Sequence, residues 1–207
     1  MTSRLKSSIL PLLLLAGLLA PCARGAGPDD KRPLQLTAEI VGSRYCAGDR
    51  LDILQLSVRL RYRNVGGEKV IVYRGKNLFY QTRIRGGAGK PYEVVVTNSR
   101  YNDAEAEALG GRRPGGAFVT LRPGGEYETV IAVGVGVARG PGERGAHTLA
   151  PGAHTLQVVT SSWYESRRLA EELRERWRGS GLLWIDPVAA APLDFDAGTG
   201  APAVPCR

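Results

Sequence analysis

The sequence predicts a mainly β protein, an antiparallel β-sandwich with one α-helix in its C-terminal region, at about residues 163–178. Apolar and polar residues alternate along 54–63, which places one set in a core and the other in water. The phrase Leu-x-Pro-Gly occurs at 121–124 and at 149–152, each time before a strand-like run. Because proline presets φ and glycine tolerates positive φ, each copy predicts a turn of the kind that joins strands in a sandwich.

Further strands are expected wherever short apolar or alternating runs lie between turn residues. The clearest turn is 64–69, Asn-Val-Gly-Gly-Glu-Lys, which predicts a hairpin between the alternating strand and an apolar return strand. The expected strands cover 34–41, 54–63, 70–73, about 79–84, 92–97, 118–121, 127–137, 155–159, 182–185 and 193–195.

The helix is predicted from its start signal and its apolar face. Ser162 and Glu165 have the spacing of a capping box. Leu169, Leu173 and Trp177 follow at i, i+4 and i+8, which makes one apolar stripe for packing against the sandwich.

Residues 1–25 are expected to be a secretory signal peptide. Arg4 and Lys6 precede an apolar run at 9–20, and small residues follow near Gly25. The run is shorter than the roughly 20 residues that span a bilayer. Cys22 leaves an alternative open, because 19–22 is similar to a bacterial lipobox, although Pro21 stands where a small residue is usual. The mature chain would be exported, periplasmic or secreted, with or without a lipid at Cys22.

The rest of the chain is expected to be one domain. Residues 26–33 read as a flexible leader, 34–197 as the sandwich with the helical insertion, and 198–207 as a tail. With Cys22 removed or lipidated, Cys46 and Cys206 remain, and an exported chain with two cysteines suggests a disulfide between them. Two unpaired thiols are the alternative.

Charge indicates a mildly basic protein. Removing 1–25 takes away three basic residues and no acidic one, so the net charge falls from +8 to +5. Basic residues do not cluster with aromatic stacking partners, so nucleic acid is not an expected partner. Arg59, Arg61 and Arg63 share one strand face and form the candidate surface for an anionic partner: a lipid headgroup, an envelope polymer or an acidic protein. The alternative is a solvated outer face.

Catalytic and metal-binding patterns are weak. His147 and His154 fit no short zinc motif. No Gly-x-Ser-x-Gly elbow surrounds Ser161 or Ser162. We therefore expect no catalytic residue, metal or cofactor, and we expect His154 to lie at the second turn beside the core.

Several of these features together resemble known sandwich families. A charged alternating strand that runs into an Asn-x-Gly turn, followed by an apolar return strand, resembles the opening of bacterial immunoglobulin-like domains. The run from Leu121 to Tyr127 is similar to the Leu-x-Pro-Gly-x-x-Tyr corner of fibronectin type III domains, and His154 replaces the tyrosine in the second copy. The order of elements over about 50–160 is also similar to proteinase-inhibitor domains of the BsuPI type. The helix lies outside the common pattern.

Three functions follow as hypotheses. The first is a non-catalytic exported protein with a binding or structural role in the bacterial cell envelope. The second, implied by the BsuPI resemblance, is a proteinase inhibitor that inserts a loop such as 75–91 or 138–148 into a protease. The third is a hydrolase, which would need His154 beside a carboxylate or serine.

Overall fold

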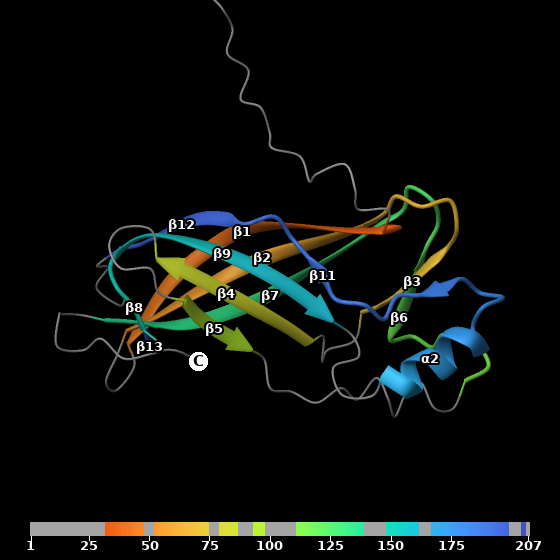
Figure 1. The fold of residues 1–207 in the computed structure, drawn as a ribbon. Coiled ribbons are helices and arrows are strands. Elements are labelled where there is room, and N and C mark those ends of the chain that lie inside the picture. Colours follow the sequence, from red (N-terminus) through yellow and green to blue (C-terminus); the bar gives the residue numbers. More distant parts are fainter. Residues whose placement is uncertain are drawn as a thin grey trace, which may run out of the picture. The chain divides into compact units, whose positions relative to one another are not determined.

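The computed structural model describes residues 32–47, 52–74, 79–86, 93–97, 111–138, 148–161, 167–198 and 204–205. All of them belong to one compact unit, Lys31–Arg207 (Figure 1). The expected signal peptide, Cys22 and most of the expected leader lie outside the described residues. Within the described part, no helix is both long and apolar enough to cross a membrane.

The largest sheet is built around one long central strand. Strand β2 (Asp52–Asn64) pairs antiparallel with β1 (Leu34–Ala47) on one side and with β7 (Glu126–Val137) on the other. The short strands β13 (Val204–Pro205) and β8 (Thr148–Leu149) extend the two edges by parallel pairing. Burial alternates along β2 as the sequence predicts, because one face meets the core and the other meets solvent.

A second sheet supplies the opposite wall of the main core. Its order is β11 (Val188–Ala189), β9 (Gly152–Ser161), β4 (Phe79–Gly86) and β5 (Glu93–Thr97), and β12 (Leu193–Ala197) also pairs with β9. Leu56 of β2, Ile84 of β4 and Leu156 of β9 are at most 1% exposed and belong to the same apolar cluster. The two sheets therefore pack face to face as a sandwich.

A third, three-stranded sheet carries the helix. Its order is β10 (Leu182–Leu183), β3 (Val70–Tyr73) and β6 (Phe118–Leu121). All four residues of β3 are buried, since Val70 and Val72 enter the main core while Ile71 and Tyr73 face a second core. This second core is closed by helix α2 (Arg167–Arg176), which buries Ala170 and Leu173, and by Trp177 directly after it (Figure 1).

The predicted fold class, a mainly β antiparallel sandwich with one helix in the C-terminal region, is confirmed. The helix occupies Arg167–Arg176 within the expected 163–178, and the Trp177 ring meets Phe118 of β6 edge to face with centroids 4.9 Å apart. Ser162 and Glu165, the residues of the expected capping box, lie outside the described residues.

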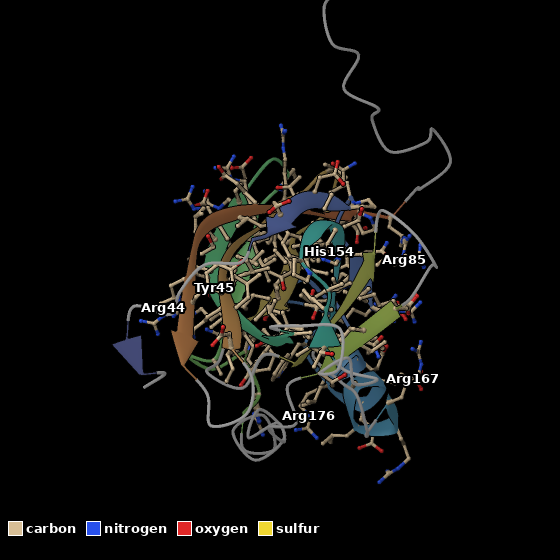
Figure 2. The ribbon with its side chains drawn as sticks, turned by 90° about the vertical axis from the view of Figure 1, so that its left-hand side faces the viewer. Arg44, Tyr45, Arg85, His154, Arg167 and Arg176 are labelled. Carbon is tan, nitrogen blue, oxygen red and sulfur yellow. The ribbon has the colours of Figure 1, made fainter. Side chains whose placement is uncertain are left out.

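Both Leu-x-Pro-Gly phrases form turns with a glycine at positive φ, 75° at Gly124 and 123° at Gly152. The second is closed by His154, which is 4% exposed. Its Nε2 lies 2.7 Å from the Ala150 carbonyl, which can only accept, so this nitrogen carries the proton. Figure 2 labels the His154 side chain among the side chains of the sandwich. The expected place of His154 beside the core is therefore observed. Tyr127 at the first turn instead stacks on a neighbouring tyrosine of β2.

Candidate functional site: a cationic hollow

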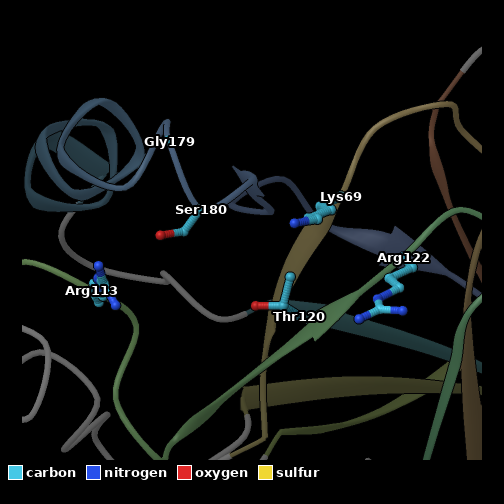
Figure 3. A pocket seen from close by; sticks show the side chains of 6 residues that line it. All are labelled: Lys69, Arg113, Thr120, Arg122, Gly179 and Ser180. Carbon is cyan, nitrogen blue, oxygen red and sulfur yellow. The ribbon is translucent and has the colours of Figure 1, made fainter.

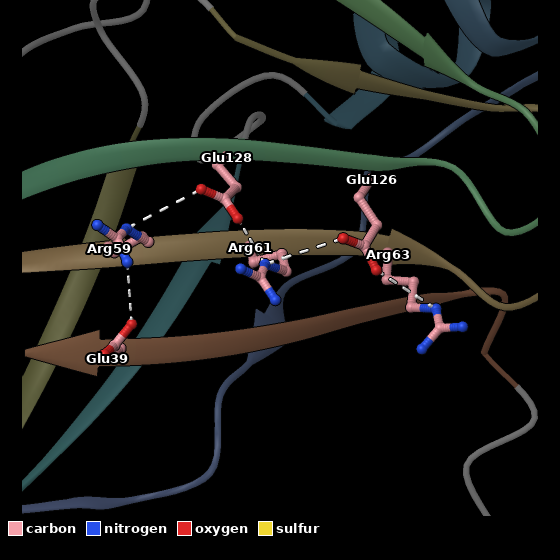
Figure 4. Close-up of polar contacts among 6 residues, drawn as sticks. All are labelled: Glu39, Arg59, Arg61, Arg63, Glu126 and Glu128. Atoms are coloured by element: carbon pink, nitrogen blue, oxygen red, sulfur yellow. Dashed lines mark hydrogen bonds and ion pairs between the residues drawn. The ribbon is translucent and has the colours of Figure 1, made fainter.

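The arginine ladder of β2 is paired with glutamates along its whole length. Glu39 comes from β1, and Glu126 and Glu128 come from β7. The register places these glutamates directly opposite the arginines, and Figure 4 shows the resulting network. Its ion pairs are Arg59–Glu39 at 3.2 Å, Arg59–Glu128 at 3.9 Å, Arg61–Glu128 at 2.6 Å, Arg61–Glu126 at 3.9 Å and Arg63–Glu126 at 3.6 Å.

This pairing changes the interpretation of the ladder. Three arginines face three glutamates, so the face carries no net charge from these six side chains. The hydrogen bond that Arg61 donates to Glu128, followed by the negative charge of that carboxylate, raises the pKa of Arg61 above the ordinary arginine value. The positive stripe that Arg59, Arg61 and Arg63 suggested in the sequence is therefore neutralised, and the geometry fits the alternative of a solvated outer face.

An uncompensated group of cations lies elsewhere, around an open hollow of about 500 Å³ beside the three-stranded sheet. We call it the cationic hollow, and Figure 3 shows its lining side chains. They come from the residue before β3, the segment before β6, β6 itself, the turn after β6 and the turn after α2. These residues are Lys69, Arg113, Thr120, Arg122, Gly179 and Ser180.

The three cations of the hollow have no carboxylate partner in the described part of the chain. Arginines on the sheets and on α2 mostly pair with glutamate or aspartate, as in the ladder and at Glu93, where Arg85 lies 3.2 Å away. Lys69, Arg113 and Arg122 form no such pair, and their side chains are exposed. The hollow therefore concentrates positive charge at the surface of a molecule whose other described charges are largely balanced.

Asn64 fixes the backbone directly before two of these cations, Lys69 and Arg122. It is fully buried, and its side-chain amide donates hydrogen bonds to the carbonyls of Glu68 at 2.6 Å and Leu121 at 3.0 Å. Glu68 immediately precedes Lys69, and Leu121 immediately precedes Arg122. One side chain thus ties the hairpin turn to the Leu-x-Pro-Gly turn.

Backbone bonds of Asn64 reinforce this connection. Its N–H donates to the Gly125 carbonyl at 2.9 Å, and its carbonyl accepts from Gly124 N–H at 2.8 Å. Its Oδ1 accepts from Gly66 N–H at 3.0 Å. The junction between the two turns is therefore fully hydrogen-bonded around one residue.

The turn after α2 is fixed against the same junction. Leu182 N–H donates to the Lys69 carbonyl at 2.8 Å. Gly181 has φ of 144°, and a Cβ there would lie 2.8 Å from that carbonyl oxygen, so only glycine fits. The indole N–H of Trp177 donates to the Gly111 carbonyl at 3.2 Å, which anchors the segment that carries Arg113.

Helix α2 is itself clamped beside the hollow. Asp186 lies 3.0 Å from Arg167 and 3.6 Å from Arg174, and Arg174 also donates to the Leu183 carbonyl at 2.9 Å. The pairing with Asp186, then that with Glu171, raises the pKa of Arg167. These contacts fix the C-terminal turn of α2, and with it Ser180, relative to β10.

The remaining candidate residues have other roles. Cys46 is 2% exposed and disulfide-bonded, and the register places Val204 of β13 opposite it. Cys206, its predicted partner, lies outside the described residues. His154 donates a hydrogen bond to the Ala150 carbonyl and packs on Phe195 with ring centroids 5.5 Å apart. Both contacts stabilise the second Leu-x-Pro-Gly turn and the core beside it.

No cluster of three or more metal-ligating side chains forms among the residues that the structure describes.

The loops on which an inhibitory function depends are described only in part. Residues 75–78, 87–92 and 139–147 lie outside the described ranges. The inhibitor hypothesis therefore stays a prediction.

Sequence reasoning did not single out Lys69, Arg113 and Arg122. A signal is present, because each stands inside or at the end of a glycine-rich turn. What the sequence lacks is the pairing of β3 with β6 and β10, which brings the three turns together.

Comparison with known proteins identifies no family for this chain. No protein-family model matches it, and no curated protein does. Among solved structures, the structural genomics target SoR45 shares 11% identity over 79% of this chain and 85% of its own, with a TM-score of 0.35. The putative ApaA protein from Bordetella pertussis shares 15% identity over 80% of this chain and 95% of its own, with a TM-score of 0.34. At these values neither likeness carries an argument about function.

Proposed function

We propose that this protein is an exported, non-catalytic β-sandwich protein that binds an anionic component of the bacterial cell envelope through the cationic hollow. The observation that carries the proposal is the group of Lys69, Arg113 and Arg122, three cations without carboxylate partners around one open hollow of about 500 Å³. Uncompensated charge beside a rigid concavity attracts an opposite charge from solution. The arginine ladder offers no comparable attraction, because glutamates already neutralise it.

The decisive comparison removes the same charge from two surfaces. One variant carries Lys69→Gln, Arg113→Gln and Arg122→Gln, and the other carries Arg59→Gln, Arg61→Gln and Arg63→Gln. Both lose three positive charges, so they affect long-range attraction similarly. Binding is measured by calorimetry with sodium polyphosphate and with polygalacturonate, and by co-sedimentation with phosphatidylglycerol vesicles.

We expect the hollow variant to lose at least about tenfold in affinity, equivalent to about 1.4 kcal/mol, while the ladder variant stays near wild type. Equal losses in both variants would mean that net charge alone governs binding. If the wild-type protein binds none of the three probes, the proposal fails. Circular dichroism of each variant checks that the fold is retained.

Export is a separate part of the proposal. It is supported by the signal-peptide layout of 1–25 and by the disulfide-bonded state of Cys46, because disulfides persist in oxidising compartments. The alignment of β13 beside the end of β1 brings the chain just before Cys206 next to Cys46, which supports that pairing. The mass of the mature N-terminal peptide and a non-reducing peptide map check both points. A retained Met1 or a free Cys206 thiol would contradict them.

A further inference from the structure

The cationic hollow combines its cations with two unused hydroxyl groups. Thr120 projects from β6, and Ser180 lies in the turn after α2 (Figure 3). The hydroxyls of both residues make no hydrogen bond to the described part of the chain. Three cations and two hydroxyl donors, supplied by separate segments, therefore surround one volume that the protein leaves open.

Building on the proposed function, we infer that the group bound in the hollow is a phosphate rather than a carboxylate. A carboxylate is planar, has two oxygens, and is satisfied by one or two arginines, as Glu128 is by Arg59 and Arg61 on the ladder. A phosphate monoester carries about −1.5 to −2 charge and three acceptor oxygens that point in different directions. Donors that separate segments supply around one hollow suit the several directions of the phosphate oxygens.

The larger negative charge of a phosphate is complemented by the three cations Lys69, Arg113 and Arg122. Both types of cation bind phosphate oxygens. Guanidinium groups bind phosphate oxygens in pairs, and a lysine ammonium adds a compact point charge. The hydroxyls of Thr120 and Ser180 would donate to oxygens that the cations do not reach.

The hollow has room for a molecule larger than a phosphate group alone. Its volume of about 500 Å³ lies within the range of roughly 300–1,000 Å³ that is usual for small-molecule sites. A Cβ built at Gly179 meets nothing within 4 Å, so this wall leaves space beyond the charged groups. A soluble phosphate monoester and a lipid that ends in a phosphate monoester, such as phosphatidic acid, share this chemistry, and the experiment separates them.

The sharpest test changes one charge at the wall. Gly179→Asp introduces a carboxylate beside the cations, and Gly179→Asn introduces a neutral side chain of the same shape. Because the position is open and its φ is not positive, both side chains are tolerated. The probes are pyrophosphate and citrate, which are of similar charge, measured by calorimetry at equal ionic strength with the full chain. Vesicles that contain phosphatidic acid, a lipid with a phosphate monoester, supply the lipid arm.

A second pair of variants tests the hydroxyls. Thr120→Val and Ser180→Ala remove the two donors without changing charge, and Thr97→Val on the exposed edge of β5 is the matched control. We expect pyrophosphate to bind at least about tenfold more tightly than citrate, about 1.4 kcal/mol. The Asp variant should abolish this binding, the Asn variant should retain it, and each hydroxyl variant should weaken it about threefold or more.

The outcomes separate this inference from the proposed function. If citrate and pyrophosphate bind equally and both depend on Lys69, Arg113 and Arg122, the phosphate inference is overturned while the anion-binding function stands. If pyrophosphate, citrate and the vesicles all fail to bind, the phosphate inference and the anion-binding function are both overturned. Vesicle binding that is lost in Gly179→Asp and kept in Gly179→Asn, without pyrophosphate binding, supports phosphate recognition with a lipid as its source.

Discussion

Tyr62 lies on the core face of β2, where its ring stacks on Tyr127 with centroids 6.1 Å apart. It is 2% exposed, and its hydroxyl makes no hydrogen bond to the described part of the chain. Burial therefore raises the pKa of Tyr62 well above the ordinary value of 10.0, because the phenolate would lie in an apolar surrounding. Tyr45 shows a smaller shift in the same direction, caused first by burial and then by the charge of Asp196.

The raised pKa predicts a sensitivity to alkali. The folded-state pKa of Tyr62 exceeds its unfolded value of 10.0. Above pH 10.0 the tyrosine therefore ionises more readily in the unfolded chain, and the stability that is present below pH 10.0 is lost as the pH rises toward the folded-state pKa. We expect Tyr62→Phe to keep more of its free energy of unfolding above that pH than wild type. Urea denaturation at neutral and alkaline pH measures this. In Tyr127→Phe, Tyr62 must still ionise on unfolding, so the alkaline loss should persist; equal curves for all three proteins would contradict the assignment.

Asn64 is the residue that connects the fold to the candidate site. Its amide donates to the carbonyls before Lys69 and Arg122, and no other residue type of that size offers two donors and one acceptor in this arrangement. A buried carbonyl that loses its donor costs about 1–3 kcal/mol.

We expect Asn64→Ala to lower the free energy of unfolding by about 2–4 kcal/mol, since the buried Leu121 carbonyl and the part-buried Glu68 carbonyl lose their donor. Anion affinity should fall as well, although the number of cations is unchanged. Gln55→Ala is the control, because that amide bonds only to the exposed Arg44 side chain, and its effect should stay within about 0.5 kcal/mol. Chemical denaturation and calorimetry provide the two readouts. A loss below about 1 kcal/mol in Asn64→Ala would show that the turns hold without it.

At the scale of elements, β3 is a strand without alternation of buried and exposed residues, because both of its faces are covered. Its residues are all apolar or aromatic and all buried, because the main core lies on one face and α2 covers the other. The apolar stripe of the helix that the sequence predicts is the surface that closes this second core. Without α2, Ile71 and Tyr73 would be exposed to water.

The helix should therefore contribute strongly to stability. Leu173 is fully buried between α2 and the sheet. We expect Leu173→Ala to destabilise by about 2–5 kcal/mol, from lost burial and the cavity left behind. Arg168→Ala on the exposed face of the same helix should change stability by no more than about 0.5 kcal/mol. Urea denaturation followed by tryptophan fluorescence measures both. A similar small effect for the two variants would show that α2 is not part of the cooperative unit.

At the scale of the whole molecule, charge and packing are organised differently. The two cores account for the burial of the sheets and the helix, whereas the described surface charges form paired networks on the outer faces. The cationic hollow departs from that balance, at the place where the hairpin turn, the Leu-x-Pro-Gly turn and the end of α2 meet. Junctions of loops on a rigid scaffold are common places for binding sites.

Local patterns in the sequence predicted much of this architecture. Alternation along 54–63 predicted β2, the glycines of the two Leu-x-Pro-Gly phrases predicted turns with positive φ, and the stripe through Leu173 predicted the helix. Each of these signals depends on residues within a few positions of one another. The parallel pairings of β8, β10 and β13 carry no such signal and were not predicted.

The candidate site depends on contacts between residues that are far apart in the sequence. The sequence by itself determined the fold class, the turns, the core face of β2 and the presence of three arginines on that strand. Only the tertiary structure decided that glutamates 20 and 67 residues away neutralise Arg59 and Arg61, and that three cations from separate turns share one hollow. The physical reason is that charge acts through space, so strand register and packing, and not spacing along the chain, decide which charges are balanced.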